Sequence, residues 1–515
     1  MNRTARHTIV SFLTALLLVP LAATTQAADV PVPPTSPTAV FSQWAQTPPM
    51  GWNSYRVLLF TGPTQDLKPV ATFLSAEFSV QVNRKGIAVY GVPNKHTGPY
   101  SFAGFDLRKP VEVRIQTRQS LDHVVIRPAG IPFTVNGREL ALKLDRPQKL
   151  SIEPAGRRGA LLLFANPVER QPPCAESGSV IHFGPGIHRP AGGRVVLTDN
   201  QTLYLEDGAI VLGTVEARNA TNVHIAGRGI LDGSSWPWQK GPSRFLVQFH
   251  NCTNASIEGI TFRSSFFWTA AIISCDRVSI TNLKILGGLN MNDDGLDICN
   301  SRRVTVRDCF IRTDDDCISI KGVPTGNIVR FGYVYDWPPA REREPVENID
   351  IADCLFWGDR ARIIEIGPEC QATHMRNIRI RDSEALHCGQ CPPLMFEAGE
   401  ECRLEDITFS NLRINAEDSP LLIELQSAGN NWQKQPSPAY VNRVRFANLR
   451  FEGAKTPRIH IFGTDKAHAI RDIVFNNLVV NGTAQKAGAS LFQIGEHVEA
   501  VSVQSSEPAR RELPE

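Results

Sequence analysis

A short unit of alternating apolar residues recurs through about the last two thirds of this 515-residue chain. Each unit is a polar residue, often Asn, followed by an apolar, a polar and an apolar residue, and successive units start 23 to 45 residues apart. The first apolar positions are Val223, Ala255, Val278, Val304, Ile349, Ile378, Ile407, Val444 and Ile473. Such a unit forms a short strand whose alternate side chains point inward, and it buries its apolar edge only by stacking on its neighbours. The repeat therefore predicts a right-handed parallel β-helix over residues 178–500.

The segment before the repeat shows a different pattern. Short alternating runs separated by turn residues occur at Glu77–Val92, Val111–Gln119, His123–Pro132 and Leu140–Ile152, without helical periodicity. This pattern predicts a β-sandwich of seven or eight strands over residues 29–170. The expected fold class is all-β, a sandwich followed by a solenoid. The sandwich contains no catalytic constellation, and we expect it to pack on the solenoid or to contact carbohydrate.

The N-terminus resembles an export signal. Arg3 and Arg6 precede an apolar run from about Ile9 to Leu21, and small residues follow up to Ala28. This order is typical of a secretory signal peptide, here residues 1–28. No later apolar run is long enough to span a membrane. We therefore expect a secreted or periplasmic protein with no membrane span, ending in a flexible tail at 501–515.

Composition limits the partners and cofactors. The formal net charge is +2, which argues against a nucleic-acid partner. Eleven cysteines lie after the signal, so at least one thiol is unpaired by disulfides. Cys388 and Cys391 form a Cys-x-x-Cys that favours a local disulfide or buried thiols over a metal site. We expect no metal, no cofactor and a monomer.

Two acidic clusters stand about one coil apart. Asn292-Asp293-Asp294-Gly295 precedes Asp314-Asp315-Asp316-Cys317 by about twenty residues, so the clusters can stack on adjacent coils. A pair of carboxyl groups, one protonated and one ionised, is what hydrolysis of a glycosidic bond requires. A solvated acidic turn or a calcium site is the alternative interpretation. Clusters at coil spacing favour the catalytic one.

Residues from about 179 to 494 resemble the polygalacturonase superfamily of pectin-lyase-like β-helices, known as glycoside hydrolase family 28. The resemblance rests on Gly227–Gly233 with the following Trp236 and Trp238, on Ser265–Thr269 with Cys275 downstream, and on the two acidic clusters. It implies inverting hydrolysis of a polysaccharide or oligosaccharide. Asp315 is then the general acid, and Asp294 and Asp316 hold and deprotonate the attacking water.

Two motifs of that family are missing. Where its Gly-His-Gly is expected, this chain has Ala361-Arg362-Ile363, and where its Arg-Ile-Lys clamp is expected it has Leu394–Glu397. An acid in place of a base is a poor partner for galacturonate, which favours a neutral glycan. Family 49 dextranases and isopullulanases resemble this chain in the sandwich before the β-helix and in the three aspartates without the His or the clamp. The amino-acid sequences of the local motifs agree better with family 28.

Further residues are expected around the three aspartates. Asp314 is expected to be a solvent-facing or turn residue and Asp297 a structural one, while Arg362 is a candidate to position Asp315. The long interval between Val304 and Ile349 predicts an inserted loop at 326–344 that walls a cleft. The candidate substrate contacts are Asn292, Lys321, Arg362, Glu365, Glu397 and Trp268.

The sequence leaves other functions open. A polygalacturonase acting on pectin, a β-helical lyase or epimerase, and a non-catalytic adhesin share this architecture. The order of the motifs favours hydrolysis over the lyase, and the coincident acidic clusters favour an enzyme over an adhesin. The sugar, the linkage and the choice of endo or exo action stay open.

Overall fold

The computed structural model describes residues 73–169, 179–323, 327–330, 333–336, 343–429 and 437–505. The predicted signal peptide, the domain boundary at 170–178 and most of the predicted tail lie outside these ranges. Within them the elements are strands, apart from one short 3-10 turn at Ala191–Gly193. No helix in the described part is long and apolar enough to cross a membrane. The all-β fold class is confirmed.

Ten strands form two five-stranded sheets before the repeat. The first sheet has the order β2-β1-β5-β8-β7 and the second β3-β4-β10-β9-β6. Their bounds are β1 Phe78–Val82, β2 Lys85–Ile87, β3 Tyr90–Val92, β4 Tyr100–Asp106, β5 Val111–Thr117, β6 Val125–Arg127, β7 Phe133–Asn136, β8 Glu139–Leu144, β9 Gln148–Arg157 and β10 Leu161–Asn166. One apolar core contains Val113 and Leu142 of the first sheet with Leu150 and Leu163 of the second, so the sheets form a sandwich.

The expected count of seven or eight strands is too low. The alternating runs leave out the short, exposed β7, and also β4 and β10, which pair with each other in parallel at the centre of the second sheet. All of β10 is buried, and four residues in a row of β4 are buried. The second sheet packs on the sandwich core with one face and on apolar residues of the solenoid with the other. A strand covered on both faces loses the alternation by which a half-exposed strand is recognised.

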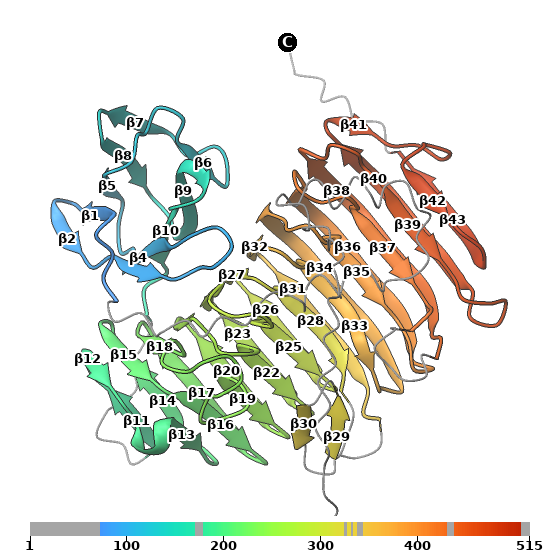
Figure 1. Cartoon of the computed structure of the whole chain (residues 1–515), viewed down its shortest axis with the longest axis horizontal. Coiled ribbons are helices and arrows are strands. Elements are labelled where there is room, and N and C mark those ends of the chain that lie inside the picture. The colour runs from blue at the N-terminus through green and yellow to red at the C-terminus, as the bar shows by residue number, and fades with distance from the viewer. Residues whose placement is uncertain are drawn as a thin grey trace, which may run out of the picture. The chain divides into compact units, whose positions relative to one another are not determined.

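After the sandwich the strands follow one another in coils, coloured from green to red in Figure 1. Three parallel rows run through the coils, and two of them join into one 20-stranded sheet. The first row is β11 Val180–Phe183, β14 Thr202–Leu205, β17 Thr221–Gly227, β20 Thr253–Glu258, β23 Asp276–Thr281, β26 Arg302–Arg307, β31 Val346–Ala352, β34 His374–His387, β36 Arg403–Asn415, β38 Tyr440–Glu452, β40 Ile470–Val480 and β43 Val498–Gln504. The second row is β12 Gly186–His188, β15 Ala209–Leu212, β18 Ile230–Asp232, β21 Thr261–Arg263, β24 Lys284–Leu286, β27 Phe310–Thr313 and β32 Leu355–Gly358. The last of these strands, β32, pairs with the long strand β34 of the first row. The short β41 Thr483–Ala484 turns back on β40.

The third row is a separate 11-stranded sheet, and it bears the site described below. Its strands are β13 Arg194–Leu197, β16 Thr214–Arg218, β19 Val247–His250, β22 Ala270–Ile273, β25 Leu296–Cys299, β28 Ile318–Gly322, β33 Ile364–Cys370, β35 Leu394–Glu397, β37 Ile423–Gln426, β39 Ile459–Phe462 and β42 Phe492–Ile494. This architecture is the parallel β-helix that the repeat predicts.

The repeat units stack in register, and all nine lie in the first row. Val278 pairs with Ala255 of the preceding coil and Val304 of the next, and Ile280 pairs with Ile257 and Val306. These inward side chains form one continuous apolar core. The polar residue that opens many units is an Asn with positive φ, such as Asn222 and Asn254. Asn tolerates this left-handed conformation, and the amide of Asn254 donates to that of Asn222 in the coil before it at 2.5 Å.

The long interval between β28 and β31 contains an antiparallel hairpin, β29 Asn327–Arg330 with β30 Tyr333–Asp336. An insertion therefore stands where the sequence predicts one, while the residues beyond it, including Trp337, lie outside the described ranges. Its role as a cleft wall stays a prediction.

The cysteines of the described ranges are buried, and none of them forms a disulfide bond. They include Cys388 and Cys391, so these two are buried thiols rather than a disulfide. Many occupy the core of the coils, as do Cys252, Cys275 and Cys299. There a thiol packs as a small apolar side chain.

Stacking in register makes a stability prediction. Ile280 is fully buried between two coils, and Ser279 on the same strand is exposed. Ile280→Ala removes three carbons from a close-packed stack and leaves a cavity, which should cost about 2–5 kcal/mol. We expect a clear fall in the midpoint of thermal unfolding followed by circular dichroism. Ser279→Ala is the control, and an equal fall in both variants would contradict the stacked core.

Candidate active site

The two acidic clusters meet at the start of adjacent strands in the 11-stranded sheet. Asp294 precedes β25 and Asp316 precedes β28, and these strands pair with Leu296 opposite Ile318. The amide of Gly295 donates to the carbonyl of Asp316 at 2.9 Å, which ties the two turns together. A Cβ on Gly295 would lie 2.4 Å from the carbonyl oxygen of Cys317, so only glycine permits this approach. The coil spacing thus brings the clusters together as predicted.

Asp315 and Asp316 have different surroundings. Asp315 is partly exposed, and its Oδ2 accepts a hydrogen bond from the side-chain amide of Asn292 at 3.1 Å. Asp316 is buried, and it accepts bonds from the backbone amide of Arg362 and from the hydroxyl of Ser319, each at 3.1 Å. The Arg362 guanidinium lies 3.5 Å from the Asp316 carboxylate. One carboxyl group therefore faces an amide, and its neighbour has a cation and two further donors.

These surroundings separate the two pKa values. Burial, followed by the negative charge of Asp316, raises the pKa of Asp315 to about 6. Burial also opposes ionisation of Asp316, but the Arg362 charge and the hydrogen bonds outweigh it and lower its pKa to about 2. Between these values Asp315 holds a proton while Asp316 is ionised. Adjacent carboxyl groups with opposite protonation states suit a general acid and a general base.

Asp294 belongs to a group of charges around Lys321. The Lys321 ammonium lies 3.0 Å from Asp294 Oδ2, 2.7 Å from Asp297 Oδ1 and 4.0 Å from Glu369 Oε2. Burial raises the pKa of Asp294, and the charges of Asp315 and Asp316 raise it further. Burial also raises the pKa of Asp297, to about 7. Lys321 keeps its charge because the nearby carboxylates outweigh its burial and raise its pKa. Asp297, expected to be structural, is thus part of this charge group.

Asp314 is not the solvent-facing residue that the sequence suggested. Its side chain is fully buried, with Oδ1 2.8 Å from His96 Nε2 and Oδ2 3.0 Å from Arg360. The preceding cluster contributes a second buried carboxyl group, Asp293. Its Oδ1 accepts the backbone amides of Asp314 and Asp315, at 2.9 and 3.1 Å. The flanking residues of both clusters therefore hold the turn on which Asp315 stands. Asp293 belongs to the first acidic cluster, but the sequence pattern assigned no role to it, because it does not show which backbone amides a carboxylate will accept.

A loop of the sandwich contacts the same turns. His96 reaches Asp314, and the amide of Lys95 donates to the carbonyl of Gly288 at 2.9 Å. Asn94 donates to Asp359 at 2.6 Å, and Asp359 also pairs with the buried Arg312 at 3.0 Å. An imidazole is thus present near the site although the family's histidine is missing from its usual coil. No sequence signal links His96 to residues more than 200 positions away.

The remaining predicted contacts are placed as follows. Arg362 contacts Asp316 through its backbone amide and its guanidinium, and a role in positioning Asp315 stays a prediction. Glu365 lies on β33 beside it, 3.6 Å from the guanidinium, and Glu397 lies on β35. Both glutamates are fully buried. Trp268 is 4% exposed, and it packs against Phe245, at 5.0 Å between centroids, and under the Lys321 ammonium. Its ring fills the core instead of standing free at the surface.

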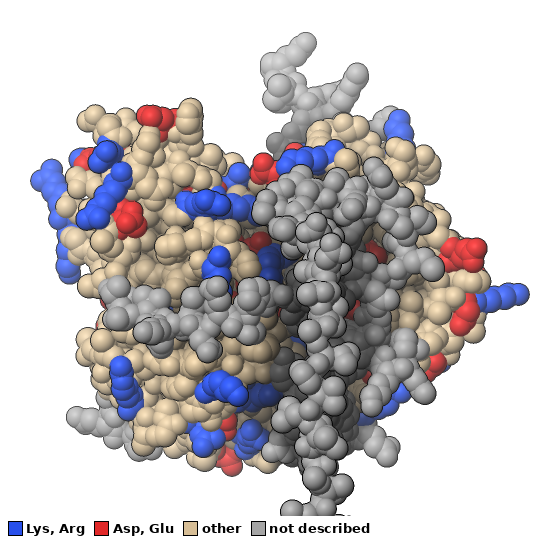
Figure 2. Space-filling model, in the orientation of Figure 1, with Lys and Arg blue, Asp and Glu red and all other residues tan. Residues whose placement is uncertain are grey.

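The described residues on the face shown in Figure 2 form no extended surface of one charge sign. Figure 2 shows Lys and Arg side chains interspersed with Asp and Glu over the described surface of the sandwich and the nearby coils. No group of three or more His, Cys, Asp or Glu side chains within the described ranges is arranged to hold a metal ion. Cationic side chains lie beside the aspartates of the site, as Arg362 does beside Asp316 and Lys321 beside Asp294.

Comparison with solved structures supports the fold. Dex49A from Penicillium minioluteum superposes with a TM-score of 0.60 at 16% identity, over 86% of this chain and 96% of that one. At this identity the likeness concerns the fold alone. It extends over most of both chains, and so through the sandwich as well as the coils.

Sequence comparison concerns the coils that bear the aspartates. A probable polygalacturonase of Arabidopsis thaliana is 33% identical over 26% of this chain and 32% of its own length. An exopolygalacturonase of Zea mays is 23% identical over 43% of this chain and 60% of its own. The chain thus spans about a third to three fifths of these curated relatives. Residues 191–334, which include Asp294, Asp315 and Asp316, match the sequence model of Glycosyl hydrolases family 28, and this match confirms the resemblance to the polygalacturonase superfamily.

Proposed function

We propose that this protein is an exported, inverting glycoside hydrolase that cleaves a neutral glycan. The observation that carries the proposal is that Asp315 faces an amide while Asp316 faces a guanidinium and two further donors, which separates their pKa values, in a segment similar to family 28. The apolar run after Arg3 and Arg6 supports export. Glycoside hydrolysis by two carboxyl groups requires this division between an acid and a base.

In the proposed reaction Asp315 protonates the glycosidic oxygen as the bond to the anomeric carbon breaks. Asp316 accepts the proton of a water molecule that Asp294 helps to hold, as the water oxygen attacks that carbon from the opposite face. The product then has the inverted configuration, and an acid and a base roughly 6.5–9.5 Å apart leave room for the water. After product release, Asp315 regains a proton from solvent and the base loses one.

Two cations prepare the carboxyl groups. Arg362 keeps Asp316 ionised, and an ionised neighbour in turn favours the protonated form of Asp315. Lys321 pairs with Asp294 and Asp297, and its charge opposes the burial that raises the pKa of both carboxyl groups. Both cations therefore act on the reacting groups through charge.

The same pairing favours a neutral sugar. A uronate carboxylate needs a cation, preferably a fork of guanidinium donors. Arg362 and Lys321 are already paired with carboxylates, and the next two strands contribute the buried carboxyl groups of Glu365 and Glu397 instead of a basic side chain. Desolvating a further carboxylate among these groups is unfavourable. Sugar hydroxyls, which donate hydrogen bonds to carboxylates, suit this lining better.

Pectin is the second candidate substrate. The specific observation in its favour is that the curated relatives with sequence similarity carry the names polygalacturonase and exopolygalacturonase. A clamp supplied by residues outside the described ranges would permit that substrate.

The first prediction of the proposal is the pH dependence of hydrolysis. Catalysis needs Asp315 protonated and Asp316 ionised, so kcat/KM should be highest between pH values of about 2 and 6. It should fall as the pH rises through about 6, because Asp315 loses its proton. Asp315→Asn should abolish turnover and leave substrate binding intact. A pH profile of kcat/KM that rises through pH 6 would exclude Asp315 as the acid.

Substrate charge gives the second prediction. Reducing ends should be released from a neutral α-glucan such as dextran, or from another neutral glycan in a panel, and not from polygalacturonate. Efficient cleavage of polygalacturonate, with no cleavage of any neutral glycan, would show that pectin is the substrate. An unsaturated product with new ultraviolet absorbance would instead show a lyase. Asp315→Asn should remove all of the hydrolytic signal.

A third prediction concerns the sandwich loop. His96 positions the turn of Asp315 through Asp314, so His96→Ala should lower kcat by about ten- to hundredfold, the scale of a small misplacement of a reacting group. KM should change little, since His96 does not contact the Asp315 or Asp316 carboxylate. His123→Ala, an exposed histidine of the same sandwich, is the matched control. An unchanged kcat in folded His96→Ala would show that the loop does not position the acid.

A further inference from the structure

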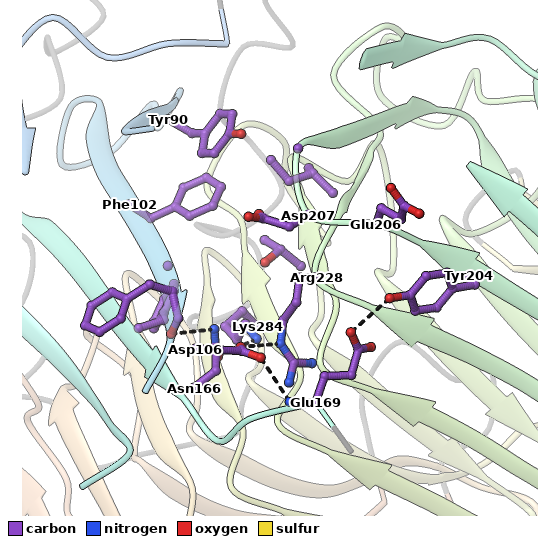
Figure 3. Close-up of a pocket in the computed structure, with 16 residues that line it drawn as sticks. Tyr90, Phe102, Asp106, Asn166, Glu169, Tyr204, Glu206, Asp207, Arg228 and Lys284 are labelled. Carbon is purple, nitrogen blue, oxygen red and sulfur yellow. Dashed lines mark hydrogen bonds and ion pairs between the residues drawn. The ribbon is translucent and has the colours of Figure 1, made fainter. Parts of the chain in front are cut away.

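A second site candidate lies away from the aspartates, where strands of the sandwich meet early coils of the β-helix. A cavity of about 410 Å³ is lined by residues of β3, β4 and β10 on one side and by the β14–β15 turn and Arg228 on the other. Figure 3 shows these side chains facing a common space. The volume falls in the range of about 300–1,000 Å³ that is typical of small-ligand sites.

One wall of the cavity is aromatic. Tyr90 is partly exposed and stacks on the buried Phe102, with 5.2 Å between ring centroids. In Figure 3 the two rings lie together on the side of the cavity opposite Glu206 and Tyr204. Stacked rings form a flat apolar surface with a hydroxyl at its rim, which suits a ligand with one apolar face and a polar edge.

The basic groups of the cavity are already engaged. Arg228 donates to Asp106 at 2.7 Å and to the carbonyl of Pro167 at 2.9 Å. Lys284 donates to the side chain of Asn166 and to the carbonyl of Asn282, each at 3.0 Å, and its burial lowers its pKa well below the usual value. Neither group offers a cation to an anionic ligand.

Acceptors remain on the other side. Glu206 pairs with His182 at 2.9 Å and Glu169 accepts the Tyr204 hydroxyl at 2.9 Å, so both are partly used. Asp207 stands at the exposed rim of the cavity, where it accepts the backbone amide of Gly208 and no side-chain partner is described for it. Burial and the charge of Asp106 raise the pKa of Asp207, and Asp207 in turn raises that of Tyr90, which places both beside the same space.

We propose that this cavity binds a neutral saccharide unit, with the sugar ring against Tyr90 and its hydroxyl groups donating to Asp207 and the neighbouring carboxylates. A uronate or phosphate is disfavoured because the local carboxylates outnumber the available cations. A metal ion is disfavoured because the acidic groups are not arranged as a ligand set. A purely apolar ligand would leave the carboxylate of Asp207 desolvated without a donor.

The cavity would give the protein a second contact with a polysaccharide, separate from the aspartate site. Linking two sites on one chain raises the apparent affinity for a long polymer without a new contact at either site. The inference stands on the cavity's own chemistry, so it holds whether or not Asp315 acts as the acid.

Isothermal titration calorimetry on the Asp315→Asn variant tests the proposal, because this variant leaves the saccharide intact. The probes are isomaltotriose, maltotriose, cellotriose and xylotriose, with trigalacturonate as the anionic comparison. At least one neutral probe should bind, and Tyr90→Ala and Asp207→Ala should each weaken binding at one site by about tenfold or more. Phe133→Ala, an exposed aromatic of the same sandwich, should change nothing.

The outcomes are separable. Neutral probes that bind equally to the Asp207→Ala variant and its parent would overturn the proposal, as would absence of binding by every neutral probe. Trigalacturonate bound at Tyr90 as tightly as the neutral probes would also overturn it. Failure of hydrolysis in the unmodified protein, with binding still dependent on Tyr90 and Asp207, would reject the proposed enzyme and keep the saccharide site.

Discussion

Stacking of coils in register determines where chemistry can occur in this chain. Each outward side chain of the 11-stranded sheet lies beside the side chain at the same position of the next coil. Asp297 is thus next to Ser319, and Ser319 next to Glu365. A cluster of carboxyl groups therefore needs no long-range folding event beyond stacking. It needs only acidic residues at corresponding positions of consecutive coils, and the stacked apolar core keeps them fixed.

Crowding so many acidic groups creates an electrostatic problem, and the neighbouring cations determine which of the groups are ionised. Buried like charges disfavour ionisation of one another, so each carboxyl group in the cluster is set by its nearest cation. Arg362 makes Asp316 a strong acid, while Asp315 has an amide partner and keeps its proton to higher pH. The two residues are adjacent in sequence and differ in their partners and in their exposure. Moving one cation would exchange or equalise their roles.

Much of this arrangement could be predicted from the sequence, and the part that could not has a common physical cause. The strands of the first row and the meeting of Asp294 with Asp315 follow from spacing, because neighbours in a solenoid are close in sequence. Strands β4 and β10 were missed because burial on both faces removes alternation. The partners of Asp314 were missed because His96 belongs to another domain. A contact over so many residues leaves no trace in local periodicity.

The sandwich contacts the site directly, which a separate binding module would not do. Its second sheet packs on the coils through Phe102, Phe164 and Tyr100, against Phe310 and Trp357 of the β-helix. From that contact one loop reaches the turn of Asp315, and the opposite end of the same sheet borders the cavity at Tyr90. Because loop and cavity share one rigid sheet, a polymer bound at Tyr90 would be held by the same element that holds the catalytic turn. On both proposals, saccharide binding and the position of Asp315 depend on one interface, so loss of the sandwich should weaken both.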